Sequence, residues 1–293
     1  MRIAQSGIIA PLPRHGRVLL FDLDQGDAVK HALEQLKTRV DGLSVVVGLG
    51  APLLQHLGVA IPGMTPLPVF DAAIAMPSVP RALWLWLRGD DPGDLFLNSR
   101  TLASQLKPAF QLVATRELFL FRQGRDLSGF HDGTENPHGD QISDVAFVHD
   151  DLTGIRGSSC VLVQTWEHRW DVLDHMGESC KEAIIGRTIK EDIELDEASS
   201  SAHVRRTAQE DFQPTAFMWR RSMPWIESMH GGLLFQAFAA QTRPLIAQLR
   251  RMSGCDDGLV DHLFRLSRPV DGAFFWCPPM HQGHLDLRAL HLG

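Results

Sequence analysis

Residues 81–88, Arg-Ala-Leu-Trp-Leu-Trp-Leu-Arg, form an apolar run that is bounded by an arginine on each side. A short continuous apolar run of this kind is typical of a strand that is buried on both faces. Outward from this run, the sequence predicts strands at 16–22, 43–49 and 110–121 and helices at 28–36 and 95–106. The first half of the chain therefore runs strand, helix, strand, strand, helix, strand.

The second half of the chain repeats this order of elements. It predicts strands at 160–166, 215–220, 233–239 and 272–276, and helices within 168–185, 241–252 and 260–266. Two successive units of this pattern predict an α+β fold of two tandem ferredoxin-like modules with antiparallel sheets. The expected boundaries are an N-terminal module at 1–125, a polar linker at 126–156 and a C-terminal module at 157–293.

The composition is that of a folded globular protein, since 44% of the 293 residues are hydrophobic and 22% are charged. The 35 acidic and 28 basic residues give a net charge of −7, which argues against a broad nucleic-acid-binding face. The sequence has no recognisable signal peptide, no apolar run long enough to span a membrane, and no CxxC pair among its four cysteines. We therefore expect a cytoplasmic protein that binds neither nucleic acid nor membrane.

Three segments carry the candidate functional residues. In 129–137, Gly-Phe-His-Asp-Gly-Thr-Glu-Asn-Pro, the glycines let a backbone approach a flat ligand while Asp132 projects into a pocket, although such residues also form ordinary surface turns. The segment 199–206 contains a histidine, His203, which by itself is more often structural than a ligand. In the segment 217–224, an apolar strand carries Arg220 at its end, where the strand can direct the guanidinium inward or leave it in solvent.

Together these three segments resemble the dye-decolorizing peroxidase family of haem proteins, and most closely its compact bacterial B-type branch. Further matching pieces are Trp-Glu-His at 166–168, Ile-Gly-Arg-Thr at 185–188, Gly-Leu-Leu-Phe at 232–235 and Gly-Ala-Phe-Phe at 272–275. The resemblance is specific from about 128 to 279, whereas in the N-terminal half it rests mainly on Ser-Gly-Ile at 6–8. It implies two ferredoxin-like modules with one haem b in the C-terminal module.

The resemblance implies that His203 is the proximal ligand of the haem iron, although this chain has Ala202 where the family often has serine. The second ring nitrogen of such a histidine needs an acceptor, and a carboxylate there makes the ligand more electron-donating. Asp261 matches the family position for this acceptor best, and Asp256 and Asp257 are nearby alternatives.

On the other haem face, the resemblance implies that Asp132 and Arg220 bind and cleave hydrogen peroxide, in catalytic roles that we assign jointly. Asn136 is expected to hold a water or a haem edge, and Arg187 to bind a haem propionate. We expect His131 to point away from the haem, because neighbouring side chains on an extended segment point to opposite sides.

The implied activity is that of a haem-dependent peroxidase, which reduces hydrogen peroxide and oxidises phenols, aromatic amines or dyes by one-electron steps through a ferryl intermediate. Because the chain has seven tryptophans and no tyrosine, a relay to bulky dyes would use tryptophan, with Trp219 as first and Trp166 as second choice. The alternatives are a haem-binding or haem-transfer protein without turnover and a chlorite-dismutase-like enzyme. A homodimer or larger homo-oligomer is expected. Enclosure in a protein shell is left as an alternative that the C-terminal sequence does not support.

Overall fold

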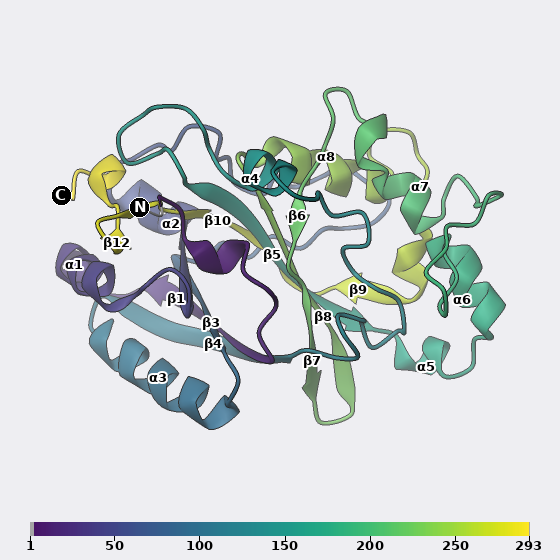
Figure 1. Cartoon of the computed structure of the whole chain (residues 1–293), viewed down its shortest axis with the longest axis horizontal. Helices are drawn as coiled ribbons and strands as arrows, with labels where there is room; N and C mark the ends of the chain where they lie inside the picture. Colours follow the sequence, from purple (N-terminus) through teal and green to yellow (C-terminus); the bar gives the residue numbers. More distant parts are fainter. Residues whose placement is uncertain (1–2, 293) are drawn as a thin grey trace.

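The computed structural model describes residues 3–292. Its N-terminal module contains four antiparallel strands in the order β4-β1-β3-β2. Figure 1 shows helices α1 and α3 on one side of these strands. The strands are β1 (His15–Leu23), β2 (Val45–Gly50), β3 (Leu83–Gly89) and β4 (Phe110–Phe119), and the helices are α1 (Val29–Arg39), α2 (Ala51–His56) and α3 (Pro92–Gln105). Apart from the short α2, this is the predicted order of elements, and it is that of a ferredoxin-like module.

In the C-terminal module the corresponding strands have the same order, β10-β5-β8-β6, that is, fourth, first, third and second along the chain. β7 follows β6 and also pairs with β8. Its strands are β5 (Ser159–His168), β6 (Trp219–Arg220), β7 (Met223–Glu227), β8 (His230–Ala239), β9 (Ser267–Pro269) and β10 (Ala273–Cys277). Its helices are α5 (Trp170–Leu173), α6 (Glu178–Ile185), α7 (His203–Thr207) and α8 (Arg243–Met252), with α4 (Gln141–Ala146) ahead of β5. Short 3-10 helices are η1 (Ser6–Ile8), η2 (Gly26–Ala28), η3 (Gln209–Asp211), η4 (His262–Arg265) and η5 (Arg288–Leu290), and β11 (Met280–His281) pairs with β12 (His284–Leu285).

The two modules share one continuous sheet, because β2 pairs antiparallel with β10. Phe275 of β10 lies opposite Gly50 of β2. A Cβ atom at position 50 would lie 1.8 Å from the carbonyl oxygen of Arg81, so only glycine fits at this junction. The predicted fold class, α+β with two tandem ferredoxin-like modules and antiparallel sheets, is therefore confirmed.

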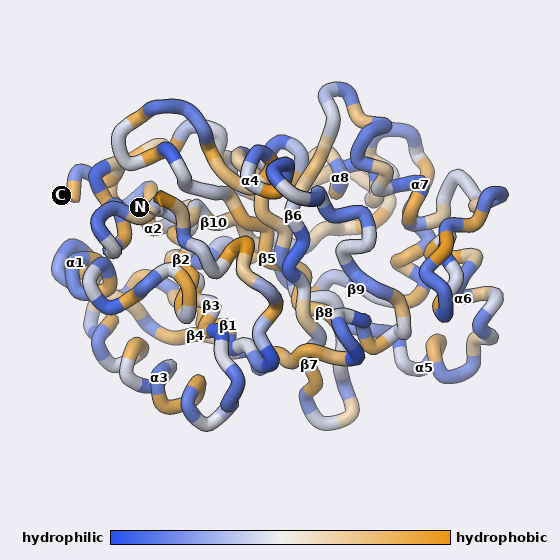
Figure 2. Tube along the Cα trace, viewed as in Figure 1, coloured by the Kyte–Doolittle hydropathy of each residue, from blue (hydrophilic) through white to orange (hydrophobic). Residues whose placement is uncertain are grey.

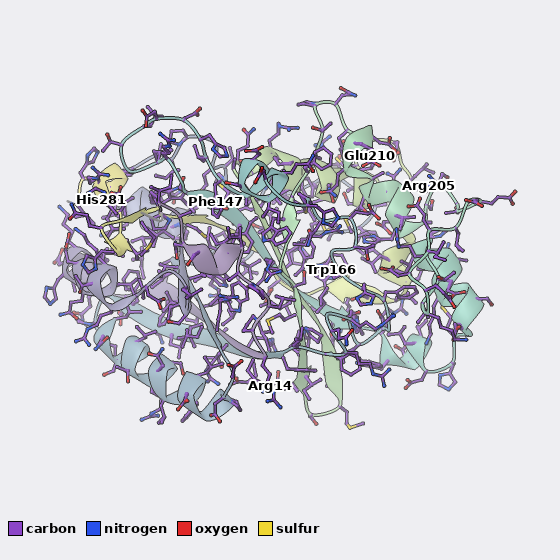
Figure 3. All side chains as sticks on the ribbon, viewed as in Figure 1. Arg14, Phe147, Trp166, Arg205, Glu210 and His281 are labelled. Atoms are coloured by element: carbon purple, nitrogen blue, oxygen red, sulfur yellow. The ribbon has the colours of Figure 1, made fainter. Side chains whose placement is uncertain are left out.

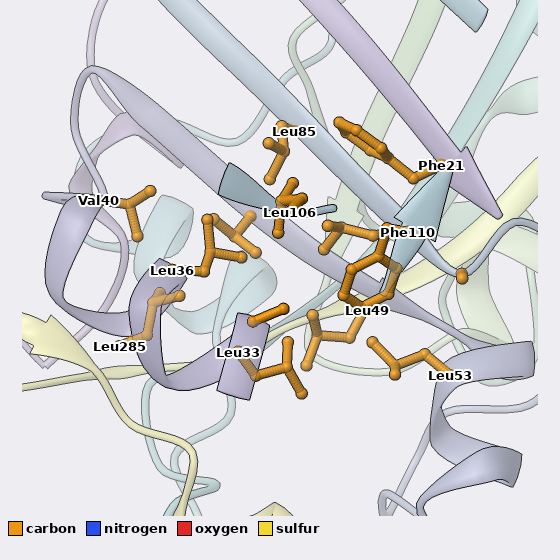
Figure 4. Packing of buried hydrophobic residues seen from close by; sticks show 14 of the residues in the cluster. Phe21, Leu33, Leu36, Val40, Leu49, Leu53, Leu85, Leu106, Phe110 and Leu285 are labelled. Carbon is orange, nitrogen blue, oxygen red and sulfur yellow. The ribbon is translucent and has the colours of Figure 1, made fainter. Parts of the chain in front are cut away.

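The run at 81–88 forms β3, which is buried on both faces as predicted. Leu83, Leu85 and Leu87 pack against α1 and α3, in the core that Figure 4 shows from close by. Trp84 and Trp86 point to the other face, where the Trp84 ring stacks on Phe275 of the C-terminal module at a centroid distance of 6.0 Å. Burying a leucine-sized side chain contributes roughly 1.5–3 kcal/mol, so β3 stabilises both the N-terminal core and the junction between the modules.

Several elements differ from the prediction. The predicted strand 215–220 is reduced to the two residues of β6, and the predicted helix 260–266 is the 3-10 helix η4. The last part of the chain, from Met280 to Leu292, packs into the core of the N-terminal module, although the sequence-based division assigns it to the C-terminal one. Because this packing joins residues that are far apart in the sequence, no local pattern predicts it. The domain boundaries stay a prediction.

The hydropathy of the trace follows this architecture. Figure 2 shows apolar residues along the central strands and hydrophilic residues in most outer loops. Among residues 3–292, no helix combines the length and the hydropathy needed to cross a membrane.

Candidate active site

A pocket lies between the sheet of the C-terminal module and the helices α7 and α8. Its empty space is about 820 Å³ when the open solvent at its mouth is included. Because side chains alternate along a strand, Leu162, Gln164 and Trp166 of β5 line the pocket while Val161 and Val163 pack between the modules. The apolar residues of α8 in its wall are Leu245, Leu249 and Met252.

His203 is the first residue of α7 and lines this pocket. Its Nδ1 lies 2.8 Å from Oδ2 of Asp261, whose side chain is 0% exposed. The other carboxylate oxygen of Asp261 accepts a hydrogen bond from the backbone N–H of Leu263 at 2.8 Å, at the start of η4. With Nδ1 engaged by the carboxylate, Nε2 is the ring nitrogen left to bind a metal, and the buried carboxylate raises the basicity of that ligand.

The other two carboxylates considered as partners of His203 have arginine partners instead. Asp256 pairs with Arg250 at 2.7 Å. Both oxygens of Asp257 accept hydrogen bonds from Arg206, each at 2.7 Å. These hydrogen bonds hold the pKa of Asp257 below its ordinary value. Because Arg206 belongs to α7, the pair fixes this helix against the loop after α8, a role that sequence reasoning did not assign.

Asp132 lies on the loop that follows β4 and lines the pocket. Gly129 (φ 102°) and Gly133 (φ 84°) both adopt the left-handed backbone conformation that favours glycine. A Cβ atom on Gly133 would also lie 2.6 Å from Nδ2 of Asn136. The turns on both sides of Asp132 thus explain the two glycines of the motif. His131 lines the pocket as well, so the loop does not show the alternation that we expected of an extended segment.

Arg220 is the last residue of β6 and lines the pocket, while its neighbour Trp219 faces the core between the modules. Asn136 holds the backbone of Arg220 at two points. Its Oδ1 accepts a hydrogen bond from the Arg220 N–H at 2.8 Å, and its Nδ2 donates to the Arg220 carbonyl oxygen at 3.0 Å. Asn136 itself is not among the residues that line the pocket. Asn136 thus positions the backbone of Arg220, and its predicted contact with a water or a haem edge stays a prediction.

Arg187 also lies outside the set of residues that line the pocket. Its guanidinium donates to Oδ1 of Asp192 at 2.9 Å and to Oε1 of Glu135 at 3.0 Å. Thr134 donates to the other carboxylate oxygen of Asp192 at 2.8 Å. These contacts tie the loop of Asp132 to the segment after α6, and the predicted bond from Arg187 to a propionate stays a prediction.

The two tryptophans considered for an electron relay lie in different places. Trp166 lines the pocket and stacks on Phe264 with ring centroids 5.5 Å apart. Trp166 is buried, and Figure 3 shows it near the centre of the view, whereas Arg205 and Glu210 lie toward the α7 end. Trp219 points away from the pocket, and its Nε1 donates to the carbonyl oxygen of Ile8 at 2.8 Å. Contact with the pocket thus favours Trp166, the reverse of the order chosen from the sequence.

The residues of the pocket fit a haem. His203, whose Nε2 is free, suits an iron whose other ligands come from a macrocycle, and the apolar walls suit a flat apolar ring. Within residues 3–292, two buried donors of lining residues, Nε of Arg220 and Nε2 of Gln164, have no hydrogen-bond partner. Leaving a buried donor unpaired costs about 1–3 kcal/mol, so a bound group with acceptor atoms would stabilise both side chains.

Two paired ferredoxin-like modules, with a carboxylate-backed histidine, an aspartate and an arginine around one pocket, are the arrangement expected of a haem peroxidase. Residues 123–282 match the family model described as Dyp-type peroxidase, C-terminal. The dye-decolorizing peroxidase of Mycobacterium tuberculosis is 30% identical over 246 residues, which cover 80% of this chain and 73% of that protein. The chain therefore belongs to the dye-decolorizing, or Dyp-type, peroxidase family, as its motifs predict.

Two further relatives extend this similarity over nearly the whole chain. The dye-decolorizing peroxidase of Rhodococcus erythropolis is 27% identical over 303 residues, which cover 92% of this chain and 85% of that protein. A variant of DypB from Rhodococcus jostii RHA1, solved in complex with haem, has a TM-score of 0.80 and 25% identity. That comparison covers 92% of this chain and 94% of DypB, so the similarity includes both modules.

Proposed function

We propose that this chain is a haem-dependent peroxidase that reduces hydrogen peroxide and oxidises phenols, aromatic amines or dyes in one-electron steps. One haem b per chain binds in the pocket of the C-terminal module. The observation that carries the proposal is the pocket itself, to which α7 contributes the Asp261-backed His203 and β6 contributes Arg220. Membership of the Dyp-type family supports the same activity.

His203 would hold the iron through Nε2 and so fix the cofactor to α7. When bound, the haem would supply the redox chemistry of the two-electron reduction of hydrogen peroxide and the one-electron oxidation of reducing substrates. Asp261 accepts the hydrogen bond of Nδ1, and its buried charge makes the imidazole a stronger electron donor. The pair Arg206–Asp257 keeps α7 in place and so preserves the direction of the imidazole.

Asp132 and Arg220 act on the peroxide. Asp132 accepts the proton of one peroxide oxygen and returns it to the other oxygen, so that the O–O bond breaks with water as the leaving group. The guanidinium of Arg220 stabilises the negative charge that develops during this cleavage. Asn136 keeps the backbone of Arg220 in register with the loop of Asp132.

An optical spectrum of the protein expressed with haem supplied, recorded before and after one equivalent of hydrogen peroxide, tests this function. We expect a Soret band in the wild type that shifts rapidly with peroxide. His203→Ala should lose most of the band, whereas His175→Ala, a change at an exposed histidine, should keep it. Asp132→Asn and Arg220→Leu should keep the band and slow the shift.

Each other outcome overturns the proposal in a recognisable way. A Soret band without a response to peroxide would identify a haem-binding or haem-transfer protein. Release of oxygen from chlorite with no dye oxidation would identify a chlorite-dismutase-like enzyme. A protein that folds but takes up no haem would refute the assignment of the pocket.

A further inference from the structure

We propose that Asp126 and His168 form a buried pair that positions the loop of Asp132, and that the rate of peroxide cleavage depends on this pair. Both are positioning residues, because they act through Asp132. The inference rests on the proposed function, since the position of Asp132 matters for rate only if the pocket reacts with peroxide. Neither residue has a part in the mechanism above.

The contacts of the pair are short and buried. Nε2 of His168 lies 2.9 Å from Oδ1 and 2.8 Å from Oδ2 of Asp126, and the two side chains are 5% and 10% exposed. Ser128 donates twice to Oδ2 of Asp126, from its hydroxyl at 2.6 Å and from its backbone N–H at 3.2 Å. Asp126 and Ser128 also line the pocket. The carboxylate is thus held by the sheet on one side and by its own loop on the other.

Burial and hydrogen bonding act in opposite directions on this carboxylate. Burial alone would raise the pKa of Asp126. The charge and hydrogen bond of His168, together with the two hydrogen bonds from Ser128, outweigh burial and hold that pKa below its ordinary value. A carboxylate that stays ionised inside the protein binds its donors more strongly than a neutral acid does. This keeps the loop attached to His168.

His168 is a rigid anchor for the loop. It is the last residue of β5 and lies opposite Ser267 of β9. Its Nδ1 lies 3.1 Å from the hydroxyl of Ser267, and its ring packs edge-on against Trp170 at a centroid distance of 5.7 Å. Because both ring nitrogens have oxygen neighbours, rotation of the imidazole would break two contacts. The anchor is therefore a buried part of the sheet.

The backbone transmits this anchor to Asp132. The N–H of Asp126 donates to the carbonyl oxygen of Phe130 at 2.7 Å, and the N–H of Gly129 donates to the carbonyl oxygen of Asp126 at 2.9 Å. Arg125 closes the same turn, because its guanidinium donates to the carbonyl oxygen of Gly129 at 2.6 Å. Asp132 follows this closed turn by two residues. A shift of Asp126 therefore moves Asp132, while Asn136 still holds Arg220.

Two substitutions of the same residue separate positioning from stability. His168→Phe keeps an aromatic ring and removes the donor to Asp126, whereas His168→Gln keeps a donor of similar reach. The readouts are the second-order rate constant of the haem-loaded protein with peroxide and the hydrogen exchange of residues 126–137, measured with and without haem. The matched control is Asp286→Asn, a change at a 5% exposed carboxylate that pairs with Arg288 far along the chain from the pocket.

We expect His168→Phe to retain its Soret band, to exchange faster in residues 126–137 and to react with peroxide about 10- to 100-fold more slowly, the effect of a displaced catalytic group. His168→Gln should recover most of the rate and of the protection. Asp286→Asn should lose stability with no change in rate. If His168→Phe does not fold, Ser267→Ala should slow the reaction to a smaller extent, because it removes the partner of Nδ1 together with a hydrogen bond to the Glu167 carbonyl oxygen.

Three results would overturn the proposal. The first is a folded His168→Phe protein that reacts with peroxide at the wild-type rate. The second is an equal loss of rate in His168→Phe and His168→Gln with unchanged exchange of the loop. The third is a wild-type rate in Ser267→Ala when His168→Phe does not fold. Failure of the proposed function looks different, because the wild type would then not respond to peroxide while exchange of the haem-free loop would still report the pairing.

Discussion

Replacing Asp261 by asparagine should raise the midpoint potential of the ferric/ferrous couple in the haem-loaded protein. The carboxylate is 0% exposed and accepts the Nδ1 hydrogen bond of His203 at 2.8 Å. A hydrogen bond to a charged group contributes about 1.5–3 kcal/mol. If the oxidised iron benefits from this charge by that full amount, its loss corresponds to roughly 60–130 mV, since 59 mV equals a tenfold change for one electron.

The sign follows from the charge. A carboxylate behind the imidazole makes the ligand more electron-donating and stabilises the ferric state, so a neutral amide should make reduction easier. Loss of such a partner typically lowers metal affinity or activity by about 10- to 100-fold, and the reaction with peroxide should slow within this range. Spectroelectrochemical titration gives the potential, and stopped-flow absorbance gives the rate.

Asp256→Asn is the control for this experiment. Asp256 lies near Asp261 in the sequence but pairs with Arg250 and is partly exposed, so its loss should leave the potential unchanged. Equal potentials for wild type and Asp261→Asn, with haem retained in both, would refute the role of the carboxylate. A shift of the same size in Asp256→Asn would show that general charge, rather than the bond to His203, sets the potential.

Three further predictions concern residues around the pocket. Asn136→Ala should slow the reaction with peroxide about tenfold through displacement of Arg220, with the haem content retained; loss of haem would instead indicate a direct contact between Asn136 and the cofactor. Trp166→Phe should lower the rate of oxidation of a bulky dye relative to that of a small phenol, whereas Trp219→Phe should not, and the opposite result would restore Trp219 as the relay. Because its arginine partner holds the folded-state pKa of Asp257 below the ordinary value of 3.8, the pair stabilises the fold above that value and loses its effect as the pH falls through the folded-state pKa. Asp257→Asn should therefore lower the melting temperature at neutral pH, with a difference from wild type that disappears in the acid range, and a constant difference at all pH values would contradict this assignment.

The fold could be predicted from the sequence where an element has an apolar pattern of its own. The run at 81–88 becomes β3 because both of its faces are covered, one by α1 and α3 and the other by the C-terminal module. The division of one strand into β6 and β7 has no such signal in the sequence. The four residues of the predicted strand before Trp219 are irregular in the structure, and β7 forms although it contains Pro224. The packing of Leu285 and Leu290 on the N-terminal module depends on contacts far along the chain.

The same limit applies to the candidate site. The motifs lead to Asp132, His203 and Arg220, and these residues do line one pocket. The partners that hold them are not local: Asn136 bonds to Arg220 over 84 positions, and His168 to Asp126 over 42. No spacing rule in a single sequence connects residues at such distances, so the groups that position the reactive side chains become visible only in the folded chain.

The distribution of hydrogen bonds on the loop has a chemical reason. A carboxylate that moves a proton between two peroxide oxygens needs free lone pairs and a fixed position. Within the described residues, the carboxylate of Asp132 has no hydrogen-bond or ion-pair partner, whereas Asp126 accepts three hydrogen bonds and Asn136 makes two. The loop thus obtains its rigidity from neighbours on both sides of Asp132. If the lone pairs of Asp132 were themselves used to hold the loop, the same rigidity would cost the site its proton acceptor.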